Sequence, residues 1–194
     1  MNTRIVTVAA LAALIATPAL AQQPQAQVPA GPGIGETAPD FSATGATRDG
    51  TLPVPITLAS LKGKTVVLAF FPRARTGGCT AQMTAYRDQY ATLFNGGKDV
   101  VVLGISNDAD TTLTNWAREQ NFPFQFVSDK DGAVGRKYGA MTETSTAARR
   151  YLYVIAPDGK ITYTAKQFMP FAPQSYTDLG EAVKKATGAA HGHE

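Results

Sequence analysis

The sequence predicts an α/β fold in which a central mixed sheet is covered by helices on both faces. Residues 66–71 form an apolar run without polar alternation, which suits a strand buried on both faces. Such strands alternate along the chain with segments that have helical spacing. Near the end, two apolar segments flank the tight turn Pro157-Asp158-Gly159 and predict an antiparallel hairpin, so the sheet should be mixed.

Residues 1–21 have the pattern of a secretory signal peptide. Arg4 supplies the positive start, residues 5–16 are a short apolar run, and Ala19-Leu20-Ala21 is an A-x-A cleavage site. We therefore expect export to the periplasm, with secretion as the second choice. An uncleaved anchor is the less favoured alternative, because the run is shorter than the roughly 20 residues that span a bilayer and Pro18 interrupts it. After cleavage we expect no membrane association.

The mature chain has room for one domain. Residues 22–33 are rich in Gln, Pro, Gly and Ala, which is typical of a flexible linker. Residues 34–188 follow as the folded domain, and residues 189–194 are expected to be a disordered tail. The tail holds His191 and His193, but two histidines supply too few ligands for a metal site, so we expect no metal and no other cofactor.

The charge balance argues against nucleic acid as a partner. The chain has 18 basic and 15 acidic side chains, and removal of Arg4 with the signal segment leaves 17 and 15. A net charge of about +2, without a basic run, offers no electrostatic surface for a polyanion.

Turn residues and apolar runs mark the elements of the domain. Before residues 56–58, the residues Gly50, Pro53 and Pro55 allow at most short edge strands. The later elements are a strand at 66–71, a helix from Cys79 to Phe94 that stops at Asn95-Gly96-Gly97, a strand at 100–105, a helix around 113–117, a strand at 124–127, a helical piece within 129–139, a polar loop at 141–148, strands at 151–155 and 160–165, and a helix at 176–187.

Cys79 is the only cysteine, so the chain, which we expect to be exported, cannot form an internal disulfide. The thiol follows a buried strand and opens a helix. At a helix N-terminus the first N–H groups lack partners and the macrodipole is positive, which favours the nucleophilic thiolate. Functional residues of open α/β sheets also gather at the carboxyl ends of strands. The alternative is that Cys79 is a small buried hydrophobe.

The segment Phe70-Phe71-Pro72-Arg73-Ala74-Arg75-Thr76-Gly77-Gly78-Cys79-Thr80 resembles the P-x-x-x-T-x-x-C signature of peroxiredoxins, thiol peroxidases with a thioredoxin-like fold. Further matches follow in family order between residues 34 and 165: Gly35-Glu36-Thr37-Ala38-Pro39-Asp40-Phe41, Leu61-Lys62-Gly63-Lys64, Tyr86-Arg87-Asp88, Ser128-Asp129, and Arg150 ahead of Gly159. The chain resembles most the bacterioferritin comigratory protein, or peroxiredoxin Q, branch. The resemblance implies a thioredoxin-like fold and reduction of hydrogen peroxide or organic hydroperoxides.

The resemblance also implies the role of each site residue. Cys79 would be the peroxidatic cysteine, with Thr76 and Arg150 beside it and Pro72 shielding it from water. Arg150 would stabilise negative charge on the sulfur and on the departing oxygen, and the N–H groups of Gly78 and Cys79 would cradle the substrate. A turn or cap role is the alternative for Thr76. Arg149 could replace Arg150, although the spacing to the hairpin turn favours Arg150.

The chain departs from the family at two positions. Many members have proline where this chain has Gly77, and members of the branch often have a resolving cysteine where it has Thr84. Without a second cysteine, the Cys79 sulfenic acid must be reduced by an external thiol, either glutathione or a thioredoxin-like or glutaredoxin-like protein. The protein would act as a monomer or a homodimer.

Two other functions are alternatives to a peroxidase. A thioredoxin-type thiol/disulfide oxidoreductase is disfavoured, since it needs a C-x-x-C pair. The second is a non-catalytic redox sensor or binding protein of thioredoxin fold, which would form an intermolecular disulfide through Cys79.

Overall fold

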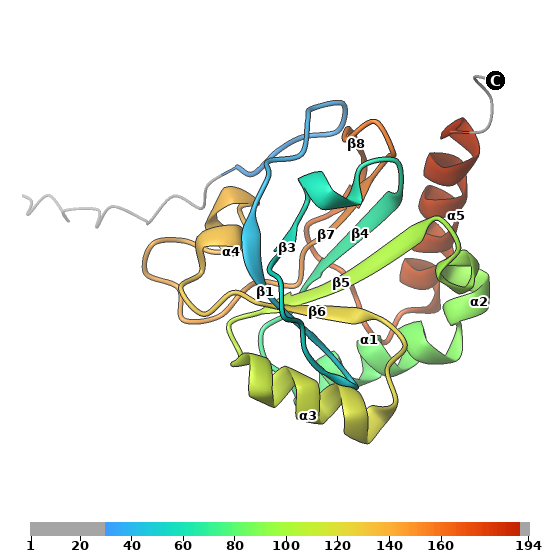
Figure 1. Ribbon diagram of the computed structural model, residues 1–194. Coiled ribbons are helices and arrows are strands. Elements are labelled where there is room, and N and C mark those ends of the chain that lie inside the picture. The colour runs from blue at the N-terminus through green and yellow to red at the C-terminus, as the bar shows by residue number, and fades with distance from the viewer. Residues whose placement is uncertain (1–29, 191–194) are drawn as a thin grey trace, which may run out of the picture.

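The computed structural model describes residues 30–190, which form a sheet with helices packed against it (Figure 1). The strands are β1 (Ser42–Thr47), β2 (Gly50–Thr51), β3 (Ile56–Thr57), β4 (Thr65–Phe70), β5 (Val100–Ser106), β6 (Gln125–Ser128), β7 (Leu152–Ile155) and β8 (Ile161–Ala165). The helices are α1 (Gly77–Asp88), α2 (Tyr90–Leu93), α3 (Asp110–Gln120), α4 (Ala133–Lys137) and α5 (Pro173–Ala190). The predicted α/β class is confirmed. The expected signal peptide lies outside the described residues.

The strands follow the order β2-β1-β6-β5-β4-β7-β8, and β3 pairs with β1. β4 lies parallel to β5, with Val66 opposite Val101, and β5 lies parallel to β6. β7 pairs with the other side of β4 in antiparallel orientation and forms the predicted hairpin with β8. The sheet is therefore mixed, and α1 and α3 supply the crossovers between its parallel strands.

β4 lies at the centre of two hydrophobic cores. All six of its residues are buried, and successive side chains point to opposite faces of the sheet. Val67 and Ala69 join the core beneath α1, α2, α3 and α5, whereas Val66 and Leu68 join the core beneath α4 and the N-terminal segment. Figure 1 shows α2 and α5 together on one side and α4 on the opposite side. Both faces are covered as predicted, but the coverage is unequal.

The N-terminal strand β1 is longer and more central than the sequence predicted. It has six residues and lies between β2 and β6, where Gly45 pairs with Val127. Its sequence, Ser-Ala-Thr-Gly-Ala-Thr, has no strongly apolar residue and little β propensity. Pairing with the other strands therefore stabilises a strand that the local sequence does not indicate.

The helix predicted from Cys79 to Phe94 is two helices, because α1 ends at Asp88 and α2 begins at Tyr90. The last helix is longer than the predicted 176–187. It begins at Pro173, where proline suits the first helical position, and continues to Ala190. It thus includes two residues of the expected tail, and residues 191–194 lie outside the described part.

Contacts with the domain begin before residue 34. Lys166 Nζ donates a hydrogen bond of 2.7 Å to the carbonyl of Ala30. Gly31 has φ +63°, and a Cβ there would overlap the carbonyl of Tyr138. The described end of the expected linker therefore packs on the domain. Among residues 30–190, no helix is long and apolar enough to cross a membrane.

Candidate active site

The loop between β4 and α1 is fixed at its centre by the carboxyl end of β5. The N–H of Ala74 donates a 2.7 Å hydrogen bond to Asp108 Oδ2, and Ser106 Oγ donates to the same oxygen at 2.8 Å. The hydroxyl of Ser128 in turn donates to the carbonyl of Asp108 at 2.7 Å. The ends of two parallel strands, β5 and β6, therefore hold Asp108, and its carboxylate sets the path of the loop.

A second contact ties the loop to α3. Arg75 has φ +63°, a left-handed conformation that is uncommon outside glycine. Its guanidinium forms a bidentate salt bridge with Glu119, with Nη2–Oε1 at 2.7 Å and Nε–Oε2 at 3.2 Å. Arg75 is thus engaged away from Cys79, and its role in the loop is structural.

Thr76 occupies the N-cap position of α1, but its side chain does not cap the helix. Its carbonyl accepts the N–H of Thr80 at 2.8 Å, which starts the helical ladder. Its hydroxyl instead donates to the carbonyl of Arg73 at 2.9 Å. Because the hydroxyl proton is used, the exposed oxygen of Thr76 is available as a hydrogen-bond acceptor.

Cys79 lies in the first turn of α1, as predicted, and its side chain is fully buried. It is a free thiol within the core that also contains Phe71, Ala74 and Met83. The first N–H groups of a helix have no partner within it, so the backbone of Gly78 and Cys79 presents donors next to the sulfur. The site therefore combines a nucleophile with hydrogen-bond donors for an anion.

Arg150 completes the site from the chain segment just before β7. Its Nη2 donates to Cys79 Sγ at 3.3 Å, and its Nη1 donates to Gln82 Oε1 at 2.6 Å. Arg149 is exposed, while Arg150 is partly buried against α1. The structure therefore selects Arg150 over Arg149, in agreement with the spacing to the hairpin turn.

The two glycines before Cys79 have different environments. A Cβ on Gly78 would lie 3.2 Å from Arg150 Nη2 and 3.5 Å from Pro170 Cγ, so a side chain there would push the arginine away. A Cβ on Gly77 would meet nothing within 4 Å. A methyl group at Gly78 would therefore displace Arg150 by a few tenths of an ångström, whereas Gly77 has room for a side chain.

Pro72 follows the buried Phe71 and is half-buried at the start of the loop. Of the sequence-predicted residues, the structure brings Gly78, Cys79 and Arg150 into direct proximity. Thr76 lies one turn before them at the helix start, and Pro72 lies on the same loop without a hydrogen bond to the others. No group of three His, Cys, Asp or Glu side chains in residues 30–190 is arranged to hold a metal ion.

Sequence reasoning missed Gln82, although a polar residue three positions after Cys79 shares its helix face. Gln82 is fully buried, accepts from Arg150, and donates from Nε2 to the Tyr86 hydroxyl at 2.9 Å. Burial raises the pKa of Tyr86 far above its usual value, against the opposing effects of the Gln82 hydrogen bond and the Arg150 charge. Tyr86 is therefore neutral at physiological pH.

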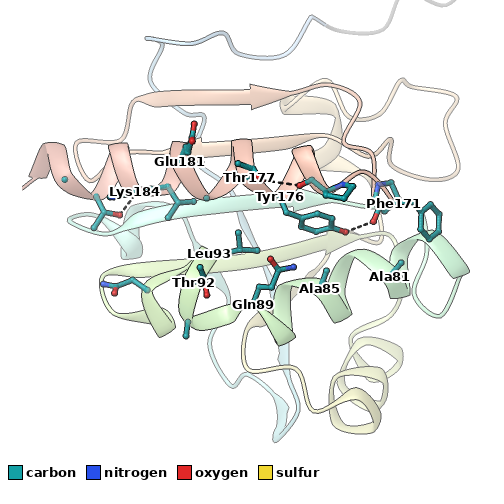
Figure 2. A pocket seen from close by; sticks show the side chains of 18 residues that line it. Ala81, Ala85, Gln89, Thr92, Leu93, Phe171, Tyr176, Thr177, Glu181 and Lys184 are labelled. Atoms are coloured by element: carbon teal, nitrogen blue, oxygen red, sulfur yellow. Dashed lines mark hydrogen bonds between the residues drawn. The ribbon is translucent and has the colours of Figure 1, made fainter.

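An apolar groove of about 1060 Å³ runs between α1–α2 and α5, beside the site rather than over it. Figure 2 shows Ala81, Ala85 and Leu93 on one wall, Tyr176 and Thr177 on the other, and Phe171 at one end. Cys79 and Arg150 are not among its lining residues. The groove therefore does not contain the reactive sulfur.

A family model described as AhpC/TSA matches residues 34–164. The chain belongs to the AhpC/TSA family. It is 37% identical over 118 residues to a Bcp peroxiredoxin sequence of Coxiella burnetii. The aligned region covers 61% of this chain and 74% of that protein. It is 33% identical over 140 residues to peroxiredoxin Bcp of Escherichia coli K12, covering 69% and 85% of the two chains. The chain is thus a peroxiredoxin, which makes it a thiol-dependent peroxidase.

A solved structure of Xanthomonas campestris peroxiredoxin Q superimposes with a TM-score of 0.64 at 21% identity, covering 76% of this chain and 92% of that one. This likeness confirms the thioredoxin-like fold. The peroxiredoxin resemblance, and its Bcp or peroxiredoxin Q branch, are likewise confirmed by the relatives.

We predict that Gly77→Pro stabilises this peroxiredoxin by about 0.4–1 kcal/mol, as measured by urea denaturation. The position is the first of α1, where proline needs no N–H partner, and Thr76 before it is already extended at φ −81°, ψ 153°. Gly78→Ala is the matched comparison and should slow peroxide reduction, because its methyl group meets Arg150. Destabilisation by Gly77→Pro would show that the helix start is not as described.

Proposed function

We propose that this peroxiredoxin is an exported one-cysteine enzyme in which Cys79 reduces hydrogen peroxide or organic hydroperoxides. The observation that carries the proposal is the 3.3 Å contact from Arg150 Nη2 to Cys79 Sγ at a helix N-terminus. The guanidinium and the N–H groups at the helix start can both stabilise negative charge on the sulfur.

The proposed oxidation step transfers one oxygen to sulfur. The Cys79 thiolate attacks the terminal O–H oxygen of ROOH, so that an S–O bond forms while the O–O bond breaks. The other oxygen leaves as an alkoxide or hydroxide and takes up a proton, and the sulfur becomes a sulfenic acid. Arg150 faces the sulfur, where it can stabilise both the attacking and the departing negative charge.

Thr76 and the helix start would orient the peroxide. The Thr76 hydroxyl oxygen can accept a hydrogen bond from the O–H of the hydroperoxide, because the hydroxyl already donates its own hydrogen bond to the carbonyl of Arg73. The N–H groups of Gly78 and Cys79 would bind the oxygen that gains charge. Pro72, half-buried at the loop start, would limit the access of water to the sulfur.

The recycling half of the reaction needs a thiol from another molecule, since Cys79 is the only cysteine. An external thiol would attack the sulfenic sulfur, release water and form a mixed disulfide, and a second thiol would then free Cys79. Because Cys79 is fully buried, the first turn of α1 must open for a thiol to reach it. Glutathione and thioredoxin-like or glutaredoxin-like proteins are the proposed reductants.

We expect Arg150→Ala to slow oxidation of Cys79 by hydrogen peroxide roughly 100- to 1000-fold, since it removes the donor aimed at the reacting charge. Arg149→Ala is the matched control and should leave the stopped-flow rate constant nearly unchanged, because its side chain is exposed. Cys79→Ser should consume no peroxide. Equal losses in the two arginine variants, or peroxide consumption by the serine variant, would refute the assignment.

The oxidised protein should accept glutathione or a thioredoxin-like or glutaredoxin-like protein on Cys79, because no thiol of the same chain can reduce it. Intact mass after oxidation and addition of each reductant measures the adduct, and Cys79→Ser is the control. If no reductant restores the thiol and a Cys79–Cys79 dimer accumulates instead, the sensor function replaces the peroxidase cycle.

Export is proposed from the signal-peptide pattern of residues 1–21. Expression of the full chain in a bacterium should give a periplasmic protein whose intact mass corresponds to a chain that begins at residue 22. The control variant Leu11→Arg interrupts the apolar run with a charge and should keep the protein in the cytoplasm. An uncleaved wild-type protein in the cytoplasmic fraction would contradict the proposal.

A further inference from the structure

Three hydrogen bonds connect the reactive sulfur to a tyrosine two turns along the same helix. Arg150 donates to Cys79 Sγ at 3.3 Å and to Gln82 Oε1 at 2.6 Å. Gln82 Nε2 then donates to the Tyr86 hydroxyl at 2.9 Å. Cys79, Gln82 and Tyr86 are all fully buried, so the bond between Gln82 and Tyr86 is shielded from competing water, and the partly buried Arg150 links it to the sulfur.

The chemistry of the guanidinium decides how the Gln82 amide is oriented. Arg150 has only donors, so the amide atom that faces it at 2.6 Å must be the carbonyl oxygen. The amide NH₂ of Gln82 therefore points the other way, where the Tyr86 hydroxyl is its acceptor. Without that acceptor, a buried N–H donor would lose its partner and the amide could rotate.

The ring of Tyr86 is packed among three aromatic rings, and these contacts restrict the position of its hydroxyl. It packs edge-on against Phe94, Phe168 and Tyr176, with ring centroids 5.2, 6.1 and 6.1 Å away. Because burial keeps the hydroxyl neutral, Tyr86 does not draw the guanidinium away from the sulfur by charge.

We infer that Tyr86 is a positioning residue for peroxide reduction, because it fixes the Gln82 amide that holds Arg150 against Cys79. This inference rests on the proposed function of Cys79. The hydroxyl touches neither the sulfur nor the substrate site, and it acts only through Gln82 and Arg150. Its removal should let Arg150 leave the geometry in which Nη2 faces the sulfur.

The test is Tyr86→Phe, which removes one oxygen atom and keeps the ring. We expect the stopped-flow rate constant for oxidation of the reduced protein by hydrogen peroxide to fall about 3- to 10-fold, the range of one buried hydrogen bond. Tyr90→Phe is the matched control, since Tyr90 packs on Phe94 in the same aromatic cluster without contacting Gln82. Its rate constant should stay within about 2-fold of the wild type.

A double-mutant cycle separates positioning from a general structural effect. In the Arg150→Ala background, Tyr86→Phe should cause no further loss, because the group that it positions is absent. An equal loss in both backgrounds would mean that the hydroxyl acts on the fold and would overturn the inference. A Tyr86→Phe rate equal to that of the wild type would also overturn it.

Gln82→Met provides a second route if Tyr86→Phe folds poorly. It replaces the amide by an apolar chain of similar size, and it should slow oxidation at least as much as Tyr86→Phe does. Normal reactivity of Gln82→Met would overturn the inference. The two proposals fail differently: an Arg150→Ala protein as fast as wild type refutes the proposed function, whereas slow Arg150→Ala with normal Tyr86→Phe and Gln82→Met refutes only the role of Tyr86.

Discussion

The contact between the Arg150 guanidinium and the Cys79 sulfur joins two parts of the chain that are far apart in sequence. The N–H of Phe70, at the end of β4, donates to the carbonyl of Tyr151, so the pairing of β4 with β7 brings Arg150 to the start of α1. A shift of this register by one residue would move Arg150 away from the start of α1. The order of the central strands is therefore a condition for the chemistry.

A partly buried guanidinium next to a buried thiol needs further hydrogen-bond partners in its surroundings. Gln82 supplies a neutral acceptor, so Arg150 keeps its full charge for the sulfur. Gly78 supplies the space, since any side chain there would approach Arg150 Nη2. On the other side of the site, Asp108 fixes the loop through Ala74. The reactive geometry is thus maintained by residues that do not react.

The sequence predicted those parts of the structure whose cause is local. Composition and turn residues predict the buried run of β4, the helix start near Cys79 and the hairpin whose turn contains Gly159. The role of Arg150 came from the peroxiredoxin resemblance, and the structure places it where that resemblance implied.

Features that depend on tertiary contacts could not be predicted in this way. β1 exists because β6 and β3 pair with it, and the break at Gln89 divides a helix whose apolar spacing continues to Phe94. The sequence placed Tyr86 within a helix, but only the fold shows that its hydroxyl meets Gln82. The Asp108 carboxylate accepts a hydrogen bond from Ala74, 34 residues earlier in the chain, and no local sequence pattern predicts such a contact.

The most direct test of this account is the intact mass of the reduced mature protein before and after one equivalent of hydrogen peroxide, with the rate followed by stopped flow. The account predicts a rapid gain of one oxygen, located on Cys79 and much faster than the oxidation of a free thiol. No gain, or only slow formation of a disulfide-linked dimer, would contradict the claim that Arg150 and the start of α1 assemble a peroxidatic site.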